Sequence, residues 1–324
     1  MTGNSIIEIL PPSSSSLVEV DAKFANLSPA AKFAWDEFFN ASIRNHHTRV
    51  AYMRAVRLFL VWLDGKKIPV DQLEPGTVGK YFDQFHGSLP KKKLHLSALR
   101  AFFDVLVNRH VMMLNPAASV RGERYQVVEG KTPEITRDQA RTLLKSIGSS
   151  RPVALRDKAL IATLIYTAAR AGAIASLRLK DFSWDGTQYA FRFMEKGGKS
   201  RSIPVRHDLQ AVLLAYLDSI NWTNEPKDAV FFRSVAGRTG ELTPKPIRNT
   251  DICRMVKRRL REAGLPGQLS PHSFRVATVT DLLTQGVSLE DVQYLAGHAD
   301  PRTTRLYDRR QKKITRNMVE RISI

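Results

Sequence analysis

The stretch QYAFRFMEKGGKSRSIPV, residues 188–205, stands out because most of this 324-residue chain has a helical pattern. Apolar and polar side chains alternate on both sides of the pair Gly197–Gly198. Such alternation places the apolar side chains on one face of a strand, and paired glycines accept the positive φ angles of a tight turn. The stretch therefore predicts a β-hairpin with strands over 188–195 and 200–205.

Helical periodicity continues on both sides of this hairpin. Thr136 is a suitable N-cap for the first of these helices, and Asp138 in its first turn favours the helix dipole. We expect helices over 136–147, 153–169, 207–220, 249–263, 273–285, 288–296 and 311–323. Together with the hairpin, they predict an α+β domain over residues 134–324.

The first half of the chain is helical in pattern from Ser28 onward. The stretch HTRVAYMRAVRLFLVWL, residues 47–63, predicts a helix with one broad apolar stripe, made of Val50, Val56, Leu60 and Leu63. Further helices are expected over 75–87 and 92–109. The first half therefore predicts an all-helical domain over residues 28–121.

Two segments lack such periodicity. RGERYQVVEGKTPE, residues 121–134, carries charges, Gly and Pro, which is typical of an interdomain linker, placed here at 122–133. The PPSSSS run at 11–16 indicates a flexible leader over residues 1–27. The predicted fold class is mainly α with a small β-sheet or hairpin, in two domains.

The chain is strongly basic, with 50 Lys and Arg against 31 Asp and Glu and a formal charge of +19. A polyanion relieves such self-repulsion, so the charge favours nucleic acid over the alternatives, a ribosome-associated or a membrane-surface protein. The single cysteine, Cys253, excludes an internal disulfide framework and a cysteine metal cluster. We see no signal peptide and no run of ~18 apolar residues, and therefore expect a cytoplasmic protein without a membrane span.

Five short patterns carry residues capable of chemistry. They are YTAARAGAIASLRLKDF (166–182), EKGGKSRSIP (195–204), SPHSFR (270–275), LAGH (295–298) and LY (306–307). Each has an ordinary explanation on its own: an arginine can snorkel from a helix end, a lysine can occupy a turn, a histidine can cap a helix, and a tyrosine can pack in a core. Their combination and order carry the information.

In this order the patterns resemble the tyrosine recombinase family, also called lambda-type or phage integrases. That family carries Arg in a T-G-x-R segment on a helix, Lys in a β-hairpin turn, H-x-x-R, then G-H, and Tyr about nine residues further on. The matching residues here are Arg170, Lys196, His272, Arg275, His298 and Tyr307. The resemblance covers the whole second domain, and more weakly residues 33–120, where it implies a SAM-like core-binding domain.

The resemblance implies a site-specific recombinase or integrase that cuts and rejoins duplex DNA through a covalent 3′-phosphotyrosyl intermediate. It also implies a DNA-associated, prokaryotic protein of the kind found on mobile elements. Arginine suits the phosphate clamp, because its guanidinium donates two parallel bonds and keeps its charge. Arg170 and Arg275 take that role, and Tyr307 is the nucleophile, whose phenolate the arginines are expected to favour.

The remaining matched residues handle protons and charge. Lys196, in the hairpin turn, is expected to protonate the leaving 5′ oxygen, and His272 to assist proton transfer. His298 is expected to donate a hydrogen bond to a phosphate oxygen. The phosphotyrosine keeps the energy of the broken bond, and we find neither a GxxxxGK[ST] motif nor a compact carboxylate cluster. The sequence therefore predicts no cofactor and no metal.

One departure from the family pattern lies just after the first arginine. The common form is T-G-x-R-x-x-E, and here Ala173 stands at the acidic position. Alanine cannot accept a hydrogen bond, so the support for the neighbouring catalytic groups must come from elsewhere or be absent. This departure leaves open a weakened enzyme, or one that needs assembly to order its site.

DNA contact is expected mostly from lysines and arginines directed at phosphates. The candidates are Arg44, Arg49, Lys91, Lys92, Lys93, Arg100, Lys257, Arg258 and Arg259. Each could instead lie on a solvated helical face. Two basic domains joined by an open linker suit a C-shaped clamp on double-stranded DNA.

The tail after Tyr307 carries Ile314, Met318 and Ile322 at helical spacing, and such an apolar stripe needs a surface to cover it. The resemblance implies that the tail docks on a neighbouring protomer and couples activity to a tetramer on DNA. Docking onto its own domain is the alternative.

Two other functions remain open from the sequence. The first is type IB topoisomerase chemistry, which relaxes supercoils without choosing a partner site. The second is a DNA-binding protein with weak or no catalysis, which Ala173 makes worth testing.

Overall fold

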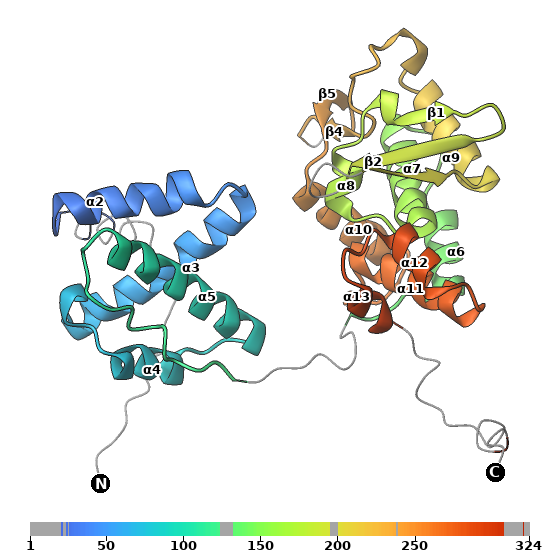
Figure 1. Cartoon of the computed structure of the whole chain (residues 1–324). Helices are drawn as coiled ribbons and strands as arrows, with labels where there is room; N and C mark the ends of the chain where they lie inside the picture. The colour runs from blue at the N-terminus through green and yellow to red at the C-terminus, as the bar shows by residue number, and fades with distance from the viewer. Residues whose placement is uncertain are drawn as a thin grey trace. The chain divides into compact units, whose positions relative to one another are not determined.

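The computed structural model describes residues 26–123, 132–194, 200–237 and 239–307, together with Asp21, Phe24 and Glu320. The chain forms two compact units, Met1–Gln126 and Val127–Ile324 (Figure 1). The expected fold class, mainly α with small antiparallel β-sheets, is confirmed. Among the described helices, none is both long enough and apolar enough to cross a membrane.

The first unit is helical over its described residues. Its helices are α2 (Pro29–Asp36), α3 (His46–Lys66), α4 (Pro75–Gln84) and α5 (Leu89–Asn108), with a π-helical turn at Glu37–Ser42 and a 3-10 turn at Val70–Gln72. Side-chain caps start two of them. The Ser28 hydroxyl accepts from the Ala31 amide at 3.0 Å, and the side-chain oxygen Oδ1 of Asn45 accepts from the Thr48 amide at 3.1 Å.

The core of the first unit is rich in aromatic rings. Phe102 on α5 lies within 5.4 Å, centroid to centroid, of both Phe24 and Phe38. Phe59 on α3 meets Tyr81 on α4 edge to face at 5.0 Å. Phe59 also meets Phe103 on α5 edge to face at 5.9 Å. Edge-to-face pairs add to the burial energy of such rings, so the contacts of Phe59 hold α3, α4 and α5 together.

The prediction of an apolar stripe on α3 is wrong for one of its four residues, Val50. Val56, Leu60 and Leu63 are buried, but Val50 is 52% exposed. A helix turns about 100° per residue, which places Val50 roughly 80–140° away from the other three side chains. Val50 therefore lies outside the face that packs on the core.

The second unit combines helices with two small sheets. Its helices are α6 (Arg137–Ser146), α7 (Pro152–Thr167), α8 (Ala171–Ala175), α9 (His207–Asp218), α10 (Asn249–Glu262), α11 (Pro271–Thr284), α12 (Leu289–Ala296) and α13 (Pro301–Arg305). Its strands are β1 (Phe182–Trp184), β2 (Tyr189–Met194), β3 (Ser200–Pro204), β4 (Arg233–Val235) and β5 (Leu242–Pro246), with 3-10 turns at Leu179–Asp181 and Trp222–Asn224. The predicted cap at Thr136 is confirmed, as a capping box with Gln139.

The predicted hairpin is confirmed as the antiparallel pair β2–β3, in which Phe191 faces Ile203 and Phe193 faces Arg201. β1 extends this pair to a three-stranded sheet of order β1-β2-β3, while β4 and β5 form a separate two-stranded sheet. The turn at 195–199 lies outside the described residues. The hairpin thus belongs to a larger sheet than the sequence predicted.

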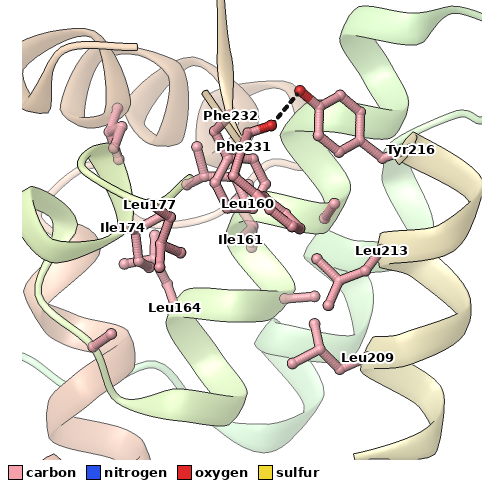
Figure 2. Close-up of a cluster of buried hydrophobic side chains, with 14 of the residues drawn as sticks. Leu160, Ile161, Leu164, Ile174, Leu177, Leu209, Leu213, Tyr216, Phe231 and Phe232 are labelled. Carbon is pink, nitrogen blue, oxygen red and sulfur yellow. Dashed lines mark hydrogen bonds between the residues drawn. The ribbon is translucent and has the colours of Figure 1, made fainter. Parts of the chain in front are cut away.

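The core of the second unit lies around α7, whose residues Leu160, Ile161 and Leu164 are buried (Figure 2). The α9 residues Leu209 and Leu213 close one side of it. The buried Tyr216 hydroxyl donates to the Phe231 carbonyl at 2.9 Å, the dashed line in Figure 2. Because α7 is packed along its length, its C-terminal end is a fixed point from which the following residues can be positioned.

The last three described helices, α11, α12 and α13, lie together in the orange to red part of Figure 1. α11 packs on α7 and α12, and α12 packs on α13. The helices expected at 273–285 and 288–296 are present as α11 and α12, and α13 was not anticipated. The helix expected at 311–323 lies outside the described residues.

Candidate active site

Five of the six predicted catalytic residues lie at helix ends of the second unit. Arg170 is the N-cap residue of α8, directly after α7, and His272 and Arg275 occupy the first turns of α11. His298 follows α12, and Tyr307 follows α13. Arg170 therefore lies in the segment between α7 and α8. The family pattern had predicted a position within a helix.

Tyr307 lies against both histidines. Its hydroxyl oxygen is 3.3 Å from Nε2 of His272, and its ring stands parallel to the His298 ring, with 5.8 Å between centroids and 9° between planes. The side chain is 8% exposed. The phenol is thus held next to an imidazole nitrogen that can accept its proton.

The expected effect of the arginines on Tyr307 does not prevail. Burial raises the pKa of Tyr307 above its ordinary value, while the positive charges of Arg275 and Arg170 act in the opposite direction and only reduce the rise. The arginines thus act in the predicted direction, but burial outweighs them and the phenol keeps its proton near pH 7. A neutral phenol needs a base, and His272 is in position to be one.

Both site histidines have lowered pKa values. Burial is the main cause for His272, followed by the charges of Arg275 and Arg170. The same three causes, in the same order, lower the pKa of His298 to about 3. Both rings are therefore neutral near pH 7, when each imidazole carries one donor and one acceptor nitrogen.

Thr304 on α13 determines how the His298 ring can act. Its hydroxyl oxygen lies 2.8 Å from Nδ1 of His298. When Thr304 donates this bond, the ring proton resides on Nε2, and His298 can donate to a phosphate oxygen as predicted. Thr304 was not predicted from the sequence, because its role depends on a contact with His298, six residues earlier in the chain.

Arg275 is 2% exposed, and its Nη1 donates to the carbonyl of Ala168 at 2.5 Å. Ala168 itself has a left-handed backbone, with φ of 49° and ψ of 21°. It stands at the glycine position of the T-G-x-R pattern, and glycine adopts this conformation without the steric penalty of a Cβ. The bend after α7 thus aims one carbonyl at Arg275 and starts the segment that carries Arg170.

The structure shows what supports Arg170 in the absence of an acidic residue at Ala173. Nη1 of Arg170 donates to the carbonyl of Gly297 at 3.0 Å. Gly297 is the left-handed C-cap of α12, with φ of 62°. A backbone carbonyl at a helix C-terminus carries partial negative charge and can hold a guanidinium.

Arg201 and Gln293 also support the end of α12 and were not predicted. Arg201 on β3 donates to the carbonyl of Leu295, and Gln293 donates from its amide to the carbonyl of His298 at 3.0 Å. A signal for Arg201 was present: it shares the inward face of the predicted strand with Ile203, two residues away. A charged residue at an inward position indicates a buried partner.

Lys196 lies outside the described residues, so its role stays a prediction. Over the described ranges, no group of three or more His, Cys, Asp or Glu is arranged to hold a metal ion.

The predicted DNA-contact residues fall into two groups. Arg44, Lys91 and Lys93 have exposed side chains, and Lys91 lies over the ring of Phe85 at 5.1 Å.

For the other six predicted residues, the partners can be named. Arg49 donates to the carbonyl of Ile43, Arg100 to those of Ala117 and Val120, and Lys257 to that of Gly267; Lys92 pairs with Glu123, and Arg258 and Arg259 pair with Asp157 and Glu262. Binding to DNA by these residues stays a prediction.

Comparisons with known proteins identify the family. The Phage integrase family matches residues 133–313, more than half of the chain, and the phage integrase N-terminal SAM-like domain matches residues 35–110. Tyrosine recombinase XerD of Chlorobaculum tepidum is 26% identical over 271 residues, which span 81% of this chain and 85% of that protein.

Two solved structures have a similar fold. XerH site-specific recombinase, in a post-cleavage complex with its palindromic difH substrate, is 18% identical, with a TM-score of 0.65 over 92% of each chain. A lambda integrase tetramer bound to a Holliday junction is 17% identical, with a TM-score of 0.57 over 93% of this chain and 79% of that one.

The fold and the relatives define an enzyme of the tyrosine recombinase class, which cuts and rejoins DNA. The chain belongs to the phage integrase family.

Proposed function

We propose that this recombinase cleaves one strand of a specific DNA site with Tyr307 and holds the strand as a 3′-phosphotyrosyl intermediate. The observation that carries the proposal is the Tyr307 hydroxyl at 3.3 Å from Nε2 of His272, beside the ring of His298. A buried phenol next to a neutral imidazole is poised for attack once a phosphate arrives.

The proposed cleavage conserves atoms and charge. The Tyr307 oxygen forms a bond to phosphorus while its proton passes to Nε2 of His272. The bond between phosphorus and the 5′ oxygen breaks, and that oxygen takes a proton from Lys196, a role that rests on the sequence pattern alone. Attack of a free 5′ hydroxyl from another strand on the phosphotyrosine reverses these steps, so that rejoining proceeds without a nucleotide or metal cofactor.

The proposed transition state gains charge on the non-bridging phosphate oxygens. Arg170 and Arg275 supply two guanidinium groups next to Tyr307, and His298 supplies an imidazole donor. Fixed donors of this kind stabilise developing charge without reorganising, which makes them the largest expected source of rate enhancement. A hydrogen bond within the protein holds each donor in place. Arg170 is bonded to Gly297, Arg275 to Ala168, and His298 to Thr304.

The wider assembly is part of the proposal. We infer a core-binding domain over 28–121, a linker over 122–133 and a catalytic domain over 134–324, which together close as a clamp on duplex DNA. A tetramer is supported by the lambda integrase tetramer on a Holliday junction, a protein of similar fold, and its joining through the C-terminal tail rests on the sequence pattern. A cytoplasmic, DNA-associated protein of a mobile element fits the basic charge and the family.

The covalent intermediate can be trapped directly. DNA protected by the protein is sequenced to define the site, and a version nicked close to the cleavage point is made so that the released fragment diffuses away. We expect wild-type protein to yield a protein–DNA adduct on a denaturing gel. Tyr307→Phe should bind the same DNA with unchanged affinity and give no adduct.

Two outcomes would contradict the proposal. Wild-type protein that binds its site but forms no adduct would favour a silent DNA-binding protein. Adduct formation by Tyr307→Phe would show that another residue is the nucleophile. Relaxation of supercoiled DNA without any need for a specific site would instead support topoisomerase chemistry.

A further inference from the structure

Arg201 is a buried arginine to which the proposed chemistry assigns no role. It lies on β3 and is 4% exposed. Its guanidinium lies over the ring of Phe193, on the paired strand β2, at 5.1 Å from the ring centroid. Burying an arginine is costly unless its donors are satisfied, so the partners of this side chain indicate its purpose.

The partners of Arg201 are carbonyl groups in the last turn of α12. Nη1 donates to the carbonyl of Leu295 and lies 3.5 Å from that of Tyr294. Carbonyls in a last helical turn lack the usual acceptor role within the helix and carry the negative end of its dipole. Arg201 thus binds the C-terminus of α12 from a neighbouring strand, with a side chain whose donors have a rigid geometry.

The same helix end supports two groups of the active site. The Gly297 carbonyl accepts from Arg170 at 3.0 Å. The next residue, His298, is fixed through its own amide, which donates to the carbonyl of Gln293 at 3.1 Å. A shift of this turn would therefore move the anchor of Arg170 and the ring of His298 together.

We propose that Arg201 is a positioning residue of the recombinase site, which sets the placement of His298 and Arg170 by fixing the last turn of α12. The inference rests on the proposed function. Positioning matters because a displacement of about 1 Å at a catalytic group can cost roughly 100-fold in rate. The charge of Arg201 also helps to lower the pKa of His298, after the larger effects of burial, Arg275, Arg170 and His272.

The test compares three variants of the full chain: Arg201→Met, Arg201→Lys and the control Arg206→Met. Arg206 also lies over an aromatic ring, that of Tyr166 at 5.3 Å, but it pairs with Asp208 on α9. Each protein is pre-bound to the nicked DNA site. The rate constant and the amplitude of adduct formation are then measured in a single turnover, with DNA affinity measured separately.

We expect Arg201→Met to form the adduct about 10- to 100-fold more slowly than wild type, with amplitude and DNA affinity within about twofold. Arg201→Lys keeps the positive charge and one donor group. Its rate constant should lie between those of wild type and Arg201→Met. Arg206→Met should match wild type.

An Arg201→Met rate constant equal to that of Arg206→Met would overturn the inference. So would a loss confined to the amplitude, because that reports a smaller folded fraction with an intact site. Should Arg201→Met fail to fold, Arg201→Lys carries the test, and a wild-type rate constant there overturns the inference. Failure of wild type itself to form an adduct would instead count against the proposed function.

Discussion

Tyr307 and its two histidines form a neutral group inside a strongly basic protein. Arg170 and Arg275 contribute positive charge to the site, yet burial outweighs that charge and raises the pKa of Tyr307. The same arginines, added to burial, lower the pKa values of His272 and His298. The site therefore keeps a protonated phenol next to an unprotonated imidazole, which is the arrangement that the proposed proton transfer requires.

The lowered pKa of His298 predicts a loss of stability in acid. The folded pKa of about 3 lies below the ordinary value of 6.5, so between these two values only the unfolded chain takes up the proton. Stability therefore falls as the pH falls through this window, by about 2 kcal/mol between pH 7 and 5. Urea unfolding of wild type and His298→Gln at both pH values measures this, and the variant should lose about 2 kcal/mol less.

The exposed residue His207, on α9 of the same unit, provides the control. His207→Gln should follow the wild-type dependence on pH. Equal losses for wild type and His298→Gln would contradict the placement of a neutral, buried ring at this position.

The candidate catalytic residues could be proposed from the sequence because their order and spacing form a pattern that chance does not readily produce, and five of them lie in the described part of the second unit. Of the residues that support them, only Arg201 left a signal in the sequence, its inward position on a predicted strand. The supporting residues are Thr304, Gln293 and Arg201. Each contacts a partner that is close in space, and the separation in sequence reaches 94 residues. The bend at Ala168 was also missed, because alanine gives no warning of a left-handed backbone.

At the scale of elements, helices and the hairpin were predictable where a single period ran through the segment. The β2–β3 pair was confirmed, since period-two alternation flanked a turn signal. β1 and β4 were missed, as three residues are too few to show a period, and β5 was missed because two of its five residues are prolines, which sheets seldom contain. α13 has only five residues, and it was missed because so short a segment shows no period. Its N-cap, Asp300, could be recognised only once the structure was known.

A buried carboxylate joins two of the long helices. Asp157 on α7 is fully buried and pairs with its neighbour Arg156, and with Arg258 and Arg259 on α10, both at 2.8 Å. These contacts give Arg258 and Arg259 a structural role beside any contact with DNA. Three guanidinium groups around one carboxylate make the carboxylate the group on which the cluster depends.

We expect Asp157→Asn to destabilise the protein by about 3–5 kcal/mol, because it leaves the buried Arg156 without its counter-charge. Urea unfolding of the full chain measures the change. The matched control is Asp138→Asn, which removes an exposed partner of Arg141 and should change stability by less than about 1 kcal/mol. Equal, small effects of both substitutions would show that the Asp157 cluster does not hold α7 to α10.

At the scale of the whole molecule, the charge of +19 is the property most directly tied to the partner. Binding of DNA through phosphates releases counterions, so affinity should fall steeply with salt. The charge could be calculated from the sequence at once, but which residues remain available for phosphate could not. That choice depends on internal partners such as Glu123 for Lys92 and Ala117 for Arg100.

Lys91 and Lys93 are exposed near the N-terminus of α5 and are candidates in the first unit for phosphate binding. Replacing both with Gln should reduce the slope of log affinity against log salt by about two, because each phosphate that a lysine neutralises adds near 0.9 to the slope. Fluorescence anisotropy over a range of salt concentrations measures the slope.

The control for this experiment is the exposed ion pair of Arg109 with Glu37, whose two bonds measure 2.7 and 2.6 Å. The double substitution Arg109→Gln and Glu37→Gln keeps the net charge and should leave the slope unchanged. An unchanged slope after replacement of both lysines would show that Lys91 and Lys93 do not bind DNA phosphates.

The central claim is that Tyr307 is the nucleophile, and the most direct test identifies the residue that carries DNA. The trapped adduct is digested with protease and nuclease, and mass spectrometry locates the nucleotide-bearing peptide. Tyr294, which is 58% exposed on α12, is a competing nucleophile in the same unit. We predict a 3′-phosphonucleotide on Tyr307, and an unchanged adduct yield in Tyr294→Phe; a modified Tyr294, or any residue other than Tyr307, would contradict the account.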